Sequence, residues 1–402
     1  MQEALERAKM IFKIFREHVL RGVAHKDGEF GERIDERLGF EGSTPPPQPS
    51  VGEAPSWRHE AKSYRSTSEL RLQELATWRT SIAWPEGAKV AFEPDRLCVR
   101  LVDGVSDSPQ TKPVQGYNYI VMSTGHLHWL ELVFRIQGEL ADLGRSVGGH
   151  RGEVRTNYVG GVDLERAFNQ VWPQALALIA SMLADDIFWQ SAPGMPLLHP
   201  SKLLAQITRF ILQDGRIVLY PEEIPSVRPA LPEKPTAYSQ KMAKLVCIYT
   251  VLHELEHVRL GHFQRELDCE MECDDAATLL SPLFVDHVEI SWNLAIGNNG
   301  VERVAARPAF FVSEQIRQLV ALYIADAQQQ VERVLHHLRE LGTRRRRQAE
   351  RLYSCVRGDH LLAEHVRQVD TEFMVIPRMV LSVLETLKPA DQDAFAEARR
   401  IL

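Results

Sequence analysis

The sequence contains none of the long hydrophobic runs that anchor a chain in a membrane. No stretch of its 402 residues approaches the roughly 18 uninterrupted apolar residues that a membrane-spanning helix requires. Residues 1–20 mix both signs of charge with apolar residues at helical spacing, which differs from the pattern of a secretory signal. These absences predict a cytoplasmic protein without a membrane partner.

Cysteine is scarce, and the five residues are Cys98, Cys247, Cys269, Cys273 and Cys355. An odd and sparse set in a long chain is unlike a disulfide framework, so we expect reduced thiols. Cys269 and Cys273, four residues apart, could chelate a metal together with His262. Because no second Cys/His pair completes this set, we interpret both as small buried residues of a helix.

The chain also lacks an excess of positive charge, since its formal net charge is -7. This balance argues against a protein whose whole surface binds nucleic acid. A Gly-rich phosphate loop and a nucleophile elbow are missing as well. The most basic segment, residues 344–347, consists of four arginines, which we interpret as a solvated helix face.

What the sequence does have is enough apolar material for a large core, with 44% hydrophobic and 25% charged residues. Its periodicity predicts helices over residues 1–23, 66–79, 123–143, 163–190, 239–260, 264–280, 311–341 and 372–402. Residues 89–102 are a candidate hairpin, and residues 117–122 and 216–220 are candidate strands. Residues 39–56 are rich in proline and predict a linker or arm. The expected class is therefore α+β, mostly α, with a small β component.

The strongest chemical pattern lies on the helix expected over residues 239–260. His253 and His257 are four residues apart, so their imidazoles share one face of a helix and can bind a single zinc ion. Glu254 lies about 100° round the helix, where its carboxylate can take a proton from a water on the metal without being a ligand. This is the arrangement of a His-Glu-x-x-His zinc hydrolase. The competing interpretation is a charged, solvated helix face.

A zinc hydrolase needs a third protein ligand, and the following helix offers one. Gly261 permits a turn, after which Glu270 can come to lie beside the two histidines. Asp274, four residues later on the same face, can accept a hydrogen bond from a ligand imidazole. Glu272 and Asp275 are the rival ligands, although Glu272 should face away from Glu270.

Residues 252–277 resemble a group of zinc peptidases that includes phage-exclusion peptidases of the Lit type and ImmA/IrrE-type peptidases. In that group the His-Glu-x-x-His helix is often followed by Gly-His, here Gly261 and His262. The resemblance implies His253, His257 and Glu270 as ligands, Glu254 as general base and Asp274 as support. It also implies a zincin-like helical metal site.

These observations together predict a zinc-dependent peptidase that cleaves an amide bond of a protein or peptide. We expect an N-terminal helix and Pro-rich arm over residues 1–59, a catalytic domain over 60–305, and a C-terminal helical region over 306–402. Two alternatives stay open. One is a zinc hydrolase with a non-peptide substrate, and the other is a non-enzymatic helical interaction or regulatory protein with a structural or degenerate site. The sequence leaves the oligomeric state undefined.

Overall fold

The structure is a computed structural model of the 402-residue chain. It describes residues 35–40, 43–44, 46, 67–82, 97–102, 109–114, 117–123, 126–138 except 128, 132 and 136, 236–262, 266–294, 301–325, 327–356, 360–387 and 392–402. The helices expected over 1–23 and 163–190, the strand expected over 216–220 and most of the Pro-rich arm lie outside these ranges.

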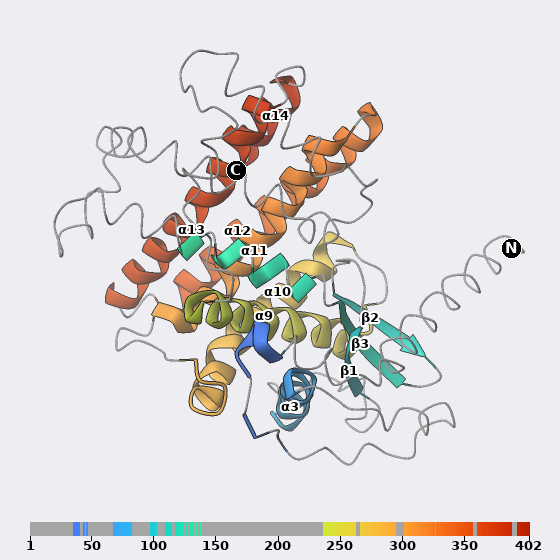
Figure 1. The fold of residues 1–402 in the computed structure, drawn as a ribbon, viewed down its shortest axis with the longest axis vertical. Helices are drawn as coiled ribbons and strands as arrows, with labels where there is room; N and C mark the ends of the chain where they lie inside the picture. Colours follow the sequence, from blue (N-terminus) through green and yellow to red (C-terminus); the bar gives the residue numbers. More distant parts are fainter. Residues whose placement is uncertain are drawn as a thin grey trace, which may run out of the picture. The chain divides into compact units, whose positions relative to one another are not determined.

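The described part is mostly helical with one small sheet, which confirms the mostly α, α+β class (Figure 1). None of the helices within the described ranges is long and apolar enough to cross a membrane. The chain divides into two compact units. The first contains Met1–His128, Lys241–Phe310 and Thr343–Val369, and the second contains Trp129–Gln240, Phe311–Gly342 and Asp370–Leu402.

The sheet of the first unit has three strands in the order β1-β3-β2. Strand β1 (Leu97–Val102) runs parallel to β3 (Tyr117–Ser123), and β2 (Gln110–Val114) runs antiparallel to β3. The strand expected over 117–122 is confirmed. Of the hairpin expected over 89–102, the structure describes only residues 97–102, which form β1 and pair with the later strand β3. Strand β2 was not predicted, since Pro113 argues against a strand, yet an edge strand accommodates a proline.

Helix α3 (Thr67–Ser81) confirms the helix expected over 66–79 and covers the outer edge of β1. The side chain of Gln73 donates to the carbonyl of Leu97 and accepts from the amide of Val99, at 3.2 and 2.9 Å. The carboxylate of Glu69 accepts from the amide of Leu101 at 3.0 Å. Side chains of α3 therefore satisfy the backbone groups that an edge strand would leave open.

Helix α9 (Ala237–Leu260) confirms the helix expected over 239–260 and is buried on nearly all sides. It ends at Gly261, whose φ of 70° suits glycine. The amide of Gly261 bonds the carbonyl of Val258, and the amide of His262 bonds the carbonyl of His257, at 3.2 and 2.9 Å. This pair of bonds is a Schellman motif, which ends the helix and holds His262 close to His257.

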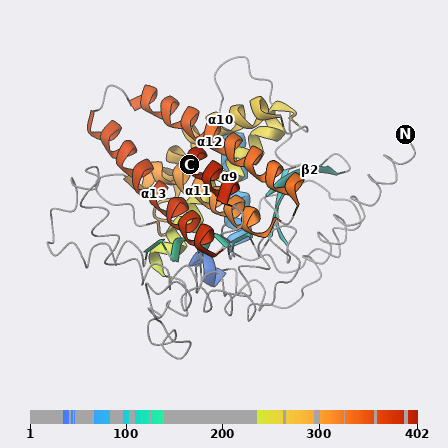
Figure 2. The same ribbon diagram turned by 90° about the horizontal axis from the view of Figure 1, so that it is seen from above.

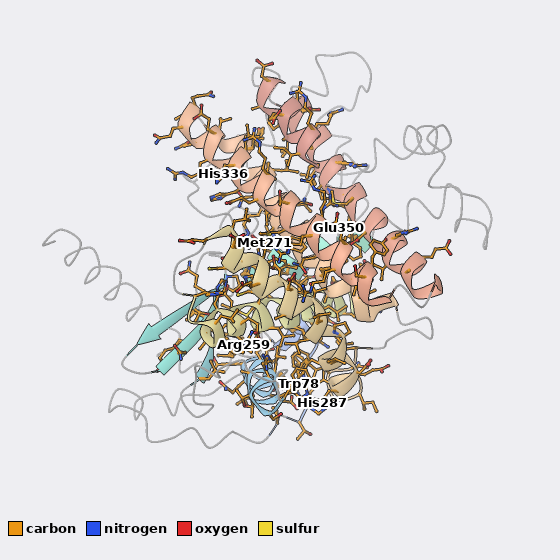
Figure 3. The ribbon with its side chains drawn as sticks, turned by 180° about the vertical axis from the view of Figure 1, so that it is seen from behind. Trp78, Arg259, Met271, His287, His336 and Glu350 are labelled. Carbon is orange, nitrogen blue, oxygen red and sulfur yellow. The ribbon has the colours of Figure 1, made fainter. Side chains whose placement is uncertain are left out.

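Helix α10 (Leu267–Val288) runs antiparallel to α9, and the two lie side by side in both ribbon views (Figures 1 and 2). The direction follows from their contacts, because Tyr249 of α9 faces Asp274 while His257, two turns later, faces Glu270. The helix expected over 264–280 is confirmed in type, but it continues through Pro282. Trp78 of α3 stacks on His287 of α10 with ring centroids 6.1 Å apart, and Figure 3 shows them together.

The carboxy-terminal part differs from expectation. Instead of one helix over 311–341, the structure has α11 (Val301–Ile324) and α12 (Gln328–Val356). No glycine or proline marks the break, so the composition carried no stop signal. The helix expected over 372–402 is two helices, α13 (His360–Leu387) and α14 (Gln392–Ile401). In the second unit Phe134 packs edge-on against Phe373 of α13, with ring centroids 6.5 Å apart.

Candidate metal centre

The turn after α9 brings three polar side chains of the first unit together. Nε2 of His253 lies 3.2 Å from Nε2 of His257 and 3.2 Å from Oε2 of Glu270. Oε1 of Glu270 lies 3.4 Å from Nε2 of His257. The three residues expected to bind metal therefore converge from α9 and α10. All three are nearly buried, with 3%, 2% and 8% of their surface exposed for His253, His257 and Glu270.

The separations between these donor atoms suit a tetrahedral metal ion. Ligand atoms held about 2.0–2.1 Å from one zinc ion in tetrahedral geometry lie about 3.3–3.4 Å from each other. The nearest approaches between these side chains, 3.2 to 3.4 Å, are close to that spacing, with Oε2 of Glu270 toward His253 and Oε1 toward His257. Two imidazoles and one carboxylate are also a donor set of catalytic zinc sites, which keep a fourth position for water or substrate.

One unsatisfied oxygen atom within this group is placed where it could bind a cation. Oε1 of Glu270 is buried and receives no hydrogen bond from the described residues, although it faces His257. Leaving a buried carboxylate oxygen without a donor costs free energy. A metal ion placed among the three side chains would satisfy this oxygen and both Nε2 lone pairs. These residues therefore fit a divalent metal ion.

Asp274 contacts His253 at the ring nitrogen that is directed away from the other candidate ligands. Its Oδ1 lies 3.0 Å from Nδ1 of His253, on the ring side opposite Nε2. A carboxylate at Nδ1 holds the imidazole in the orientation and tautomer that leave Nε2 free for a metal. Burial alone would lower the pKa of His253, but Asp274 and Glu270 outweigh burial and raise this pKa to about 9. The site therefore attracts positive charge.

Arg344 of α12 is the counter-ion of the carboxylates. Its guanidinium bonds both oxygens of Asp274, at 2.6 and 2.9 Å, and its third nitrogen lies 3.0 Å from Oε2 of Glu270. Burial would raise the pKa of Glu270, but contacts with His253 and His257 and the charge of Arg344 hold it well below its ordinary value. Arg344 occupies Oε2 of Glu270 and so leaves Oε1 for a metal.

Glu254 lies beside the two histidines, as expected for a general base. One oxygen of Glu254, one ring nitrogen of His253 and one of His257 lie within 4.8 Å of each other. The hydroxyl of Thr111, on strand β2, lies 2.9 Å from Oε2 of Glu254 and 3.0 Å from its backbone carbonyl. Since one hydroxyl has a single proton, it serves these two acceptors in turn and keeps the carboxylate close to the strand.

The rival ligands are placed elsewhere. Glu272 is exposed and lies 3.5 Å from Nε2 of His262. Asp275 accepts from Gln348 at 2.6 Å and pairs with Arg347 and Arg351 at 3.3 and 2.8 Å. Both are therefore directed away from the histidine pair, as the helix geometry predicted for Glu272.

Two contributors to the site were not identified from the sequence. Thr111 lies in the unpredicted strand β2, and no motif marks it. The run 344–347 was interpreted as a solvated face, and this is wrong for Arg344, which is 9% exposed. The available signal was the apolar pattern of α12, which places Leu338, Leu341 and Arg344 on one buried stripe.

Compared with known proteins, the sequence matches no family model and no curated protein, and the structure matches no solved structure. The residues and geometry of the site are therefore the basis on which its function is inferred.

Proposed function

We propose that this chain is a zinc-dependent peptidase whose metal ligands are His253, His257 and Glu270. The observation that carries the proposal is the convergence of three side chains whose nearest nitrogen and oxygen atoms lie 3.2–3.4 Å apart, close to the spacing around one tetrahedral ion. We assign Glu254, which lies beside the two histidines, as the base and not as a fourth ligand, because four protein ligands would close the site as in structural zinc sites.

The residues divide the chemistry between them. Zinc held by the three ligands would lower the pKa of a water molecule and polarise the scissile carbonyl. Glu254 accepts the proton of that water and later donates it to the departing amine. The hydroxyl of Thr111 donates to Oε2 of Glu254 and holds this carboxylate beside strand β2. Asp274 and Arg344 hold His253 and Glu270 in their binding orientations.

A peptide is the substrate class favoured by strand β2. Within the described sheet, β2 pairs with β3 on one side only, so its other edge has no described partner strand. Because the side chain of Thr111 bonds Glu254, strand β2 lies next to the candidate base. An extended peptide can add to such an edge through main-chain hydrogen bonds, which places an amide carbonyl beside the metal.

The test combines metal content with hydrolysis of a peptide library by the purified full-length chain. The wild type is expected to contain one zinc ion at the three-ligand site and to release new amino termini. Glu254→Gln should keep that zinc and lose hydrolysis by about 10²–10⁴-fold, because the base is gone and the ligands remain. His257→Ala should lose both.

Two results would contradict the proposal. Full peptide hydrolysis by Glu254→Gln would remove the assigned base. Peptide hydrolysis retained by a variant that carries both His253→Ala and Glu270→Ala would place the catalytic metal elsewhere. Hydrolysis of esters or other acyl bonds with no cleavage of peptides would leave the site intact but change its substrate class.

A further inference from the structure

A second group of metal-binding side chains lies next to the first, at the carboxyl end of α9. One ring nitrogen of His257, one of His262 and Sγ of Cys273 lie within 4.8 Å of each other. Nδ1 of His262 lies 4.0 Å from Sγ of Cys273. We define His257, His262 and Cys273 as the thiol cluster. The Schellman motif at Gly261 fixes its geometry, because the amide of His262 bonds the carbonyl of His257.

Only one of the two ring nitrogens of His257 is directed at the first site. Nε2 of His257 faces His253 and Glu270, as described above. Nδ1 of His257 is buried and has no hydrogen-bond partner among the described residues. Since His257 is only 2% exposed, solvent does not readily satisfy this atom, and a buried ring nitrogen without a partner is costly.

The second histidine is already oriented for a ligand. Nε2 of His262 lies 3.5 Å from Oε2 of Glu272, and Nδ1 on the other side of the ring faces Cys273. A carboxylate at one ring nitrogen holds the N–H proton there and directs the lone pair of the other nitrogen toward a metal. Glu272, unsuited as a ligand of the first site, thus has a supporting position in the second.

We propose that His257, His262 and Cys273 form a second metal site, which takes a thiophilic divalent ion and shares the imidazole of His257 with the first site. A tetrahedral ion bound to one sulfur and one nitrogen separates them by roughly 3.5 Å, given bond lengths of about 2.3 and 2.0–2.1 Å. The 4.0 Å between Nδ1 of His262 and Sγ of Cys273 would have to close by about 0.5 Å. Thiolate and imidazole ligands suit Zn²⁺ and its spectroscopic substitute Co²⁺.

Binding at this site releases protons to solvent. The thiol of Cys273 becomes a thiolate when its sulfur binds the ion. The imidazole of His257 gives up its remaining N–H proton when both of its nitrogens are bound. Because these protons must be displaced, the second site should fill after the first.

The experiment is a Co²⁺ titration of the full-length chain, stripped of metal with a chelator and kept reduced with a phosphine. Thiolate-to-cobalt charge transfer gives an absorption band in the near ultraviolet that oxygen and nitrogen ligands do not give. The wild type is expected to bind two Co²⁺ ions per chain, and the thiolate band should develop with the second equivalent.

Variants assign the band to the cluster. Cys273→Ser and His262→Ala should each abolish it and retain one ion. Cys269→Ser is the matched control, because Cys269 lies one turn away on α10, outside the cluster. The thiolate band of this variant should be unchanged. His253→Ala should lose the first ion and keep the band. This last variant separates the failure of the second site from a failure of the proposed function.

The inference is overturned if the wild type binds a single Co²⁺ ion or if the band survives Cys273→Ser. A band lost equally in Cys269→Ser would also overturn it. Circular dichroism of each variant, compared with the wild type, checks the fold. If Cys273→Ser is misfolded, His262→Asn replaces it, because His262 is the partly exposed residue of the thiol cluster. The inference is then overturned if the band survives His262→Asn.

Discussion

Helix α9 carries two groups of buried charged side chains on different faces. One contains the candidate ligands His253 and His257 with the base Glu254. The other is built on Glu256, whose Oε1 accepts from Nε of Arg79 at 2.7 Å and whose Oε2 accepts from Nε of Arg259. Arg259 is labelled in Figure 3. We call Glu256, Arg79 and Arg259 the Glu256 cluster.

The two groups differ in how their charges are satisfied. Both oxygens of Glu256 have a guanidinium partner, so this carboxylate is fully paired. In the metal centre, Oε1 of Glu270 has no hydrogen bond from the described residues. A buried polar group with all its hydrogen-bond partners contributes to structure. A buried polar group without a partner, next to candidate metal ligands, points to a function. The following substitutions test this distinction, from the largest expected effect to the smallest.

Glu254 and Glu256 allow the same substitution two positions apart. Glu256→Gln should lower the free energy of unfolding by about 3–5 kcal/mol, because two buried guanidinium groups lose their counter-charge. It should leave zinc content and the catalytic rate of the folded fraction unchanged. Glu254→Gln should do the reverse, with a loss of hydrolysis and a change in stability below about 1 kcal/mol. Urea denaturation and zinc analysis of both variants provide the comparison, and a similar loss of stability in both would remove the distinction.

Arg344→Met should make the protein more dependent on its metal. Without the guanidinium, Asp274 and Glu270 keep negative charge in a buried place, so the zinc-free protein should lose about 3 kcal/mol of stability. Zinc then becomes the main counter-cation. The rise in melting temperature on adding zinc should therefore exceed that of the wild type. Arg346→Met is the control, since this exposed arginine is on the same helix. An equal response of the wild type and Arg344→Met to zinc would refute this role.

Lys244 is a third kind of buried charge on α9, since it bonds the carbonyl of Trp292 at 2.7 Å and lies over the ring of Phe40. Burial, with a smaller contribution from Arg71, lowers the pKa of Lys244 from 10.5 to about 8. Between these two values the unfolded chain holds the proton more tightly, so stability should rise with pH.

Lys244→Met removes this titration. Relative to the variant, the wild type should gain about 2 kcal/mol of unfolding free energy between pH 8 and pH 10.5. Denaturant titrations of both proteins at these pH values measure the difference. A pH profile that is identical in the two proteins would show that Lys244 does not carry the shift.

Thr111→Val should have the smallest effect and should act on rate alone. The substitution keeps the shape of the side chain and removes the hydroxyl that bonds Glu254. A hydrogen bond from a hydroxyl to a carboxylate contributes about 1.5–3 kcal/mol, and this hydroxyl is shared with a backbone carbonyl, so we expect the lower value and a fall in kcat of about tenfold. Zinc content should not change. Recovery of the wild-type rate in Thr111→Ser would separate loss of the hydroxyl from altered packing.

The sequence predicted the parts of the site that follow local rules. The spacing of His253 and His257 and the turn at Gly261 depend on helix geometry, so α9 and its end could be inferred without tertiary information. Glu270 and Asp274 followed because the next helix begins soon after the turn. Helix α10 was predicted too short, since a proline such as Pro282 is normally a stop signal.

The remaining parts depend on contacts between distant segments. Arg344 reaches Asp274 from 70 positions along the chain, and Thr111 reaches Glu254 from 143 positions. Neither residue type carries a signal at that range, so a buried counter-ion was mistaken for one of four solvated arginines. The break between α11 and α12 was missed because residues 325–328 are compatible with a continuous helix.

The contact between Arg344 and Asp274 also sets a lower limit on the length of any shortened version of the protein. A fragment that ends at residue 305 retains His253, His257, Glu270 and Glu254, and thus every group that a motif search would select. It would nevertheless expose Asp274 and Glu270 without the guanidinium that neutralises them in the whole chain. Expression trials for crystallography should therefore extend through Val356, the last residue of α12.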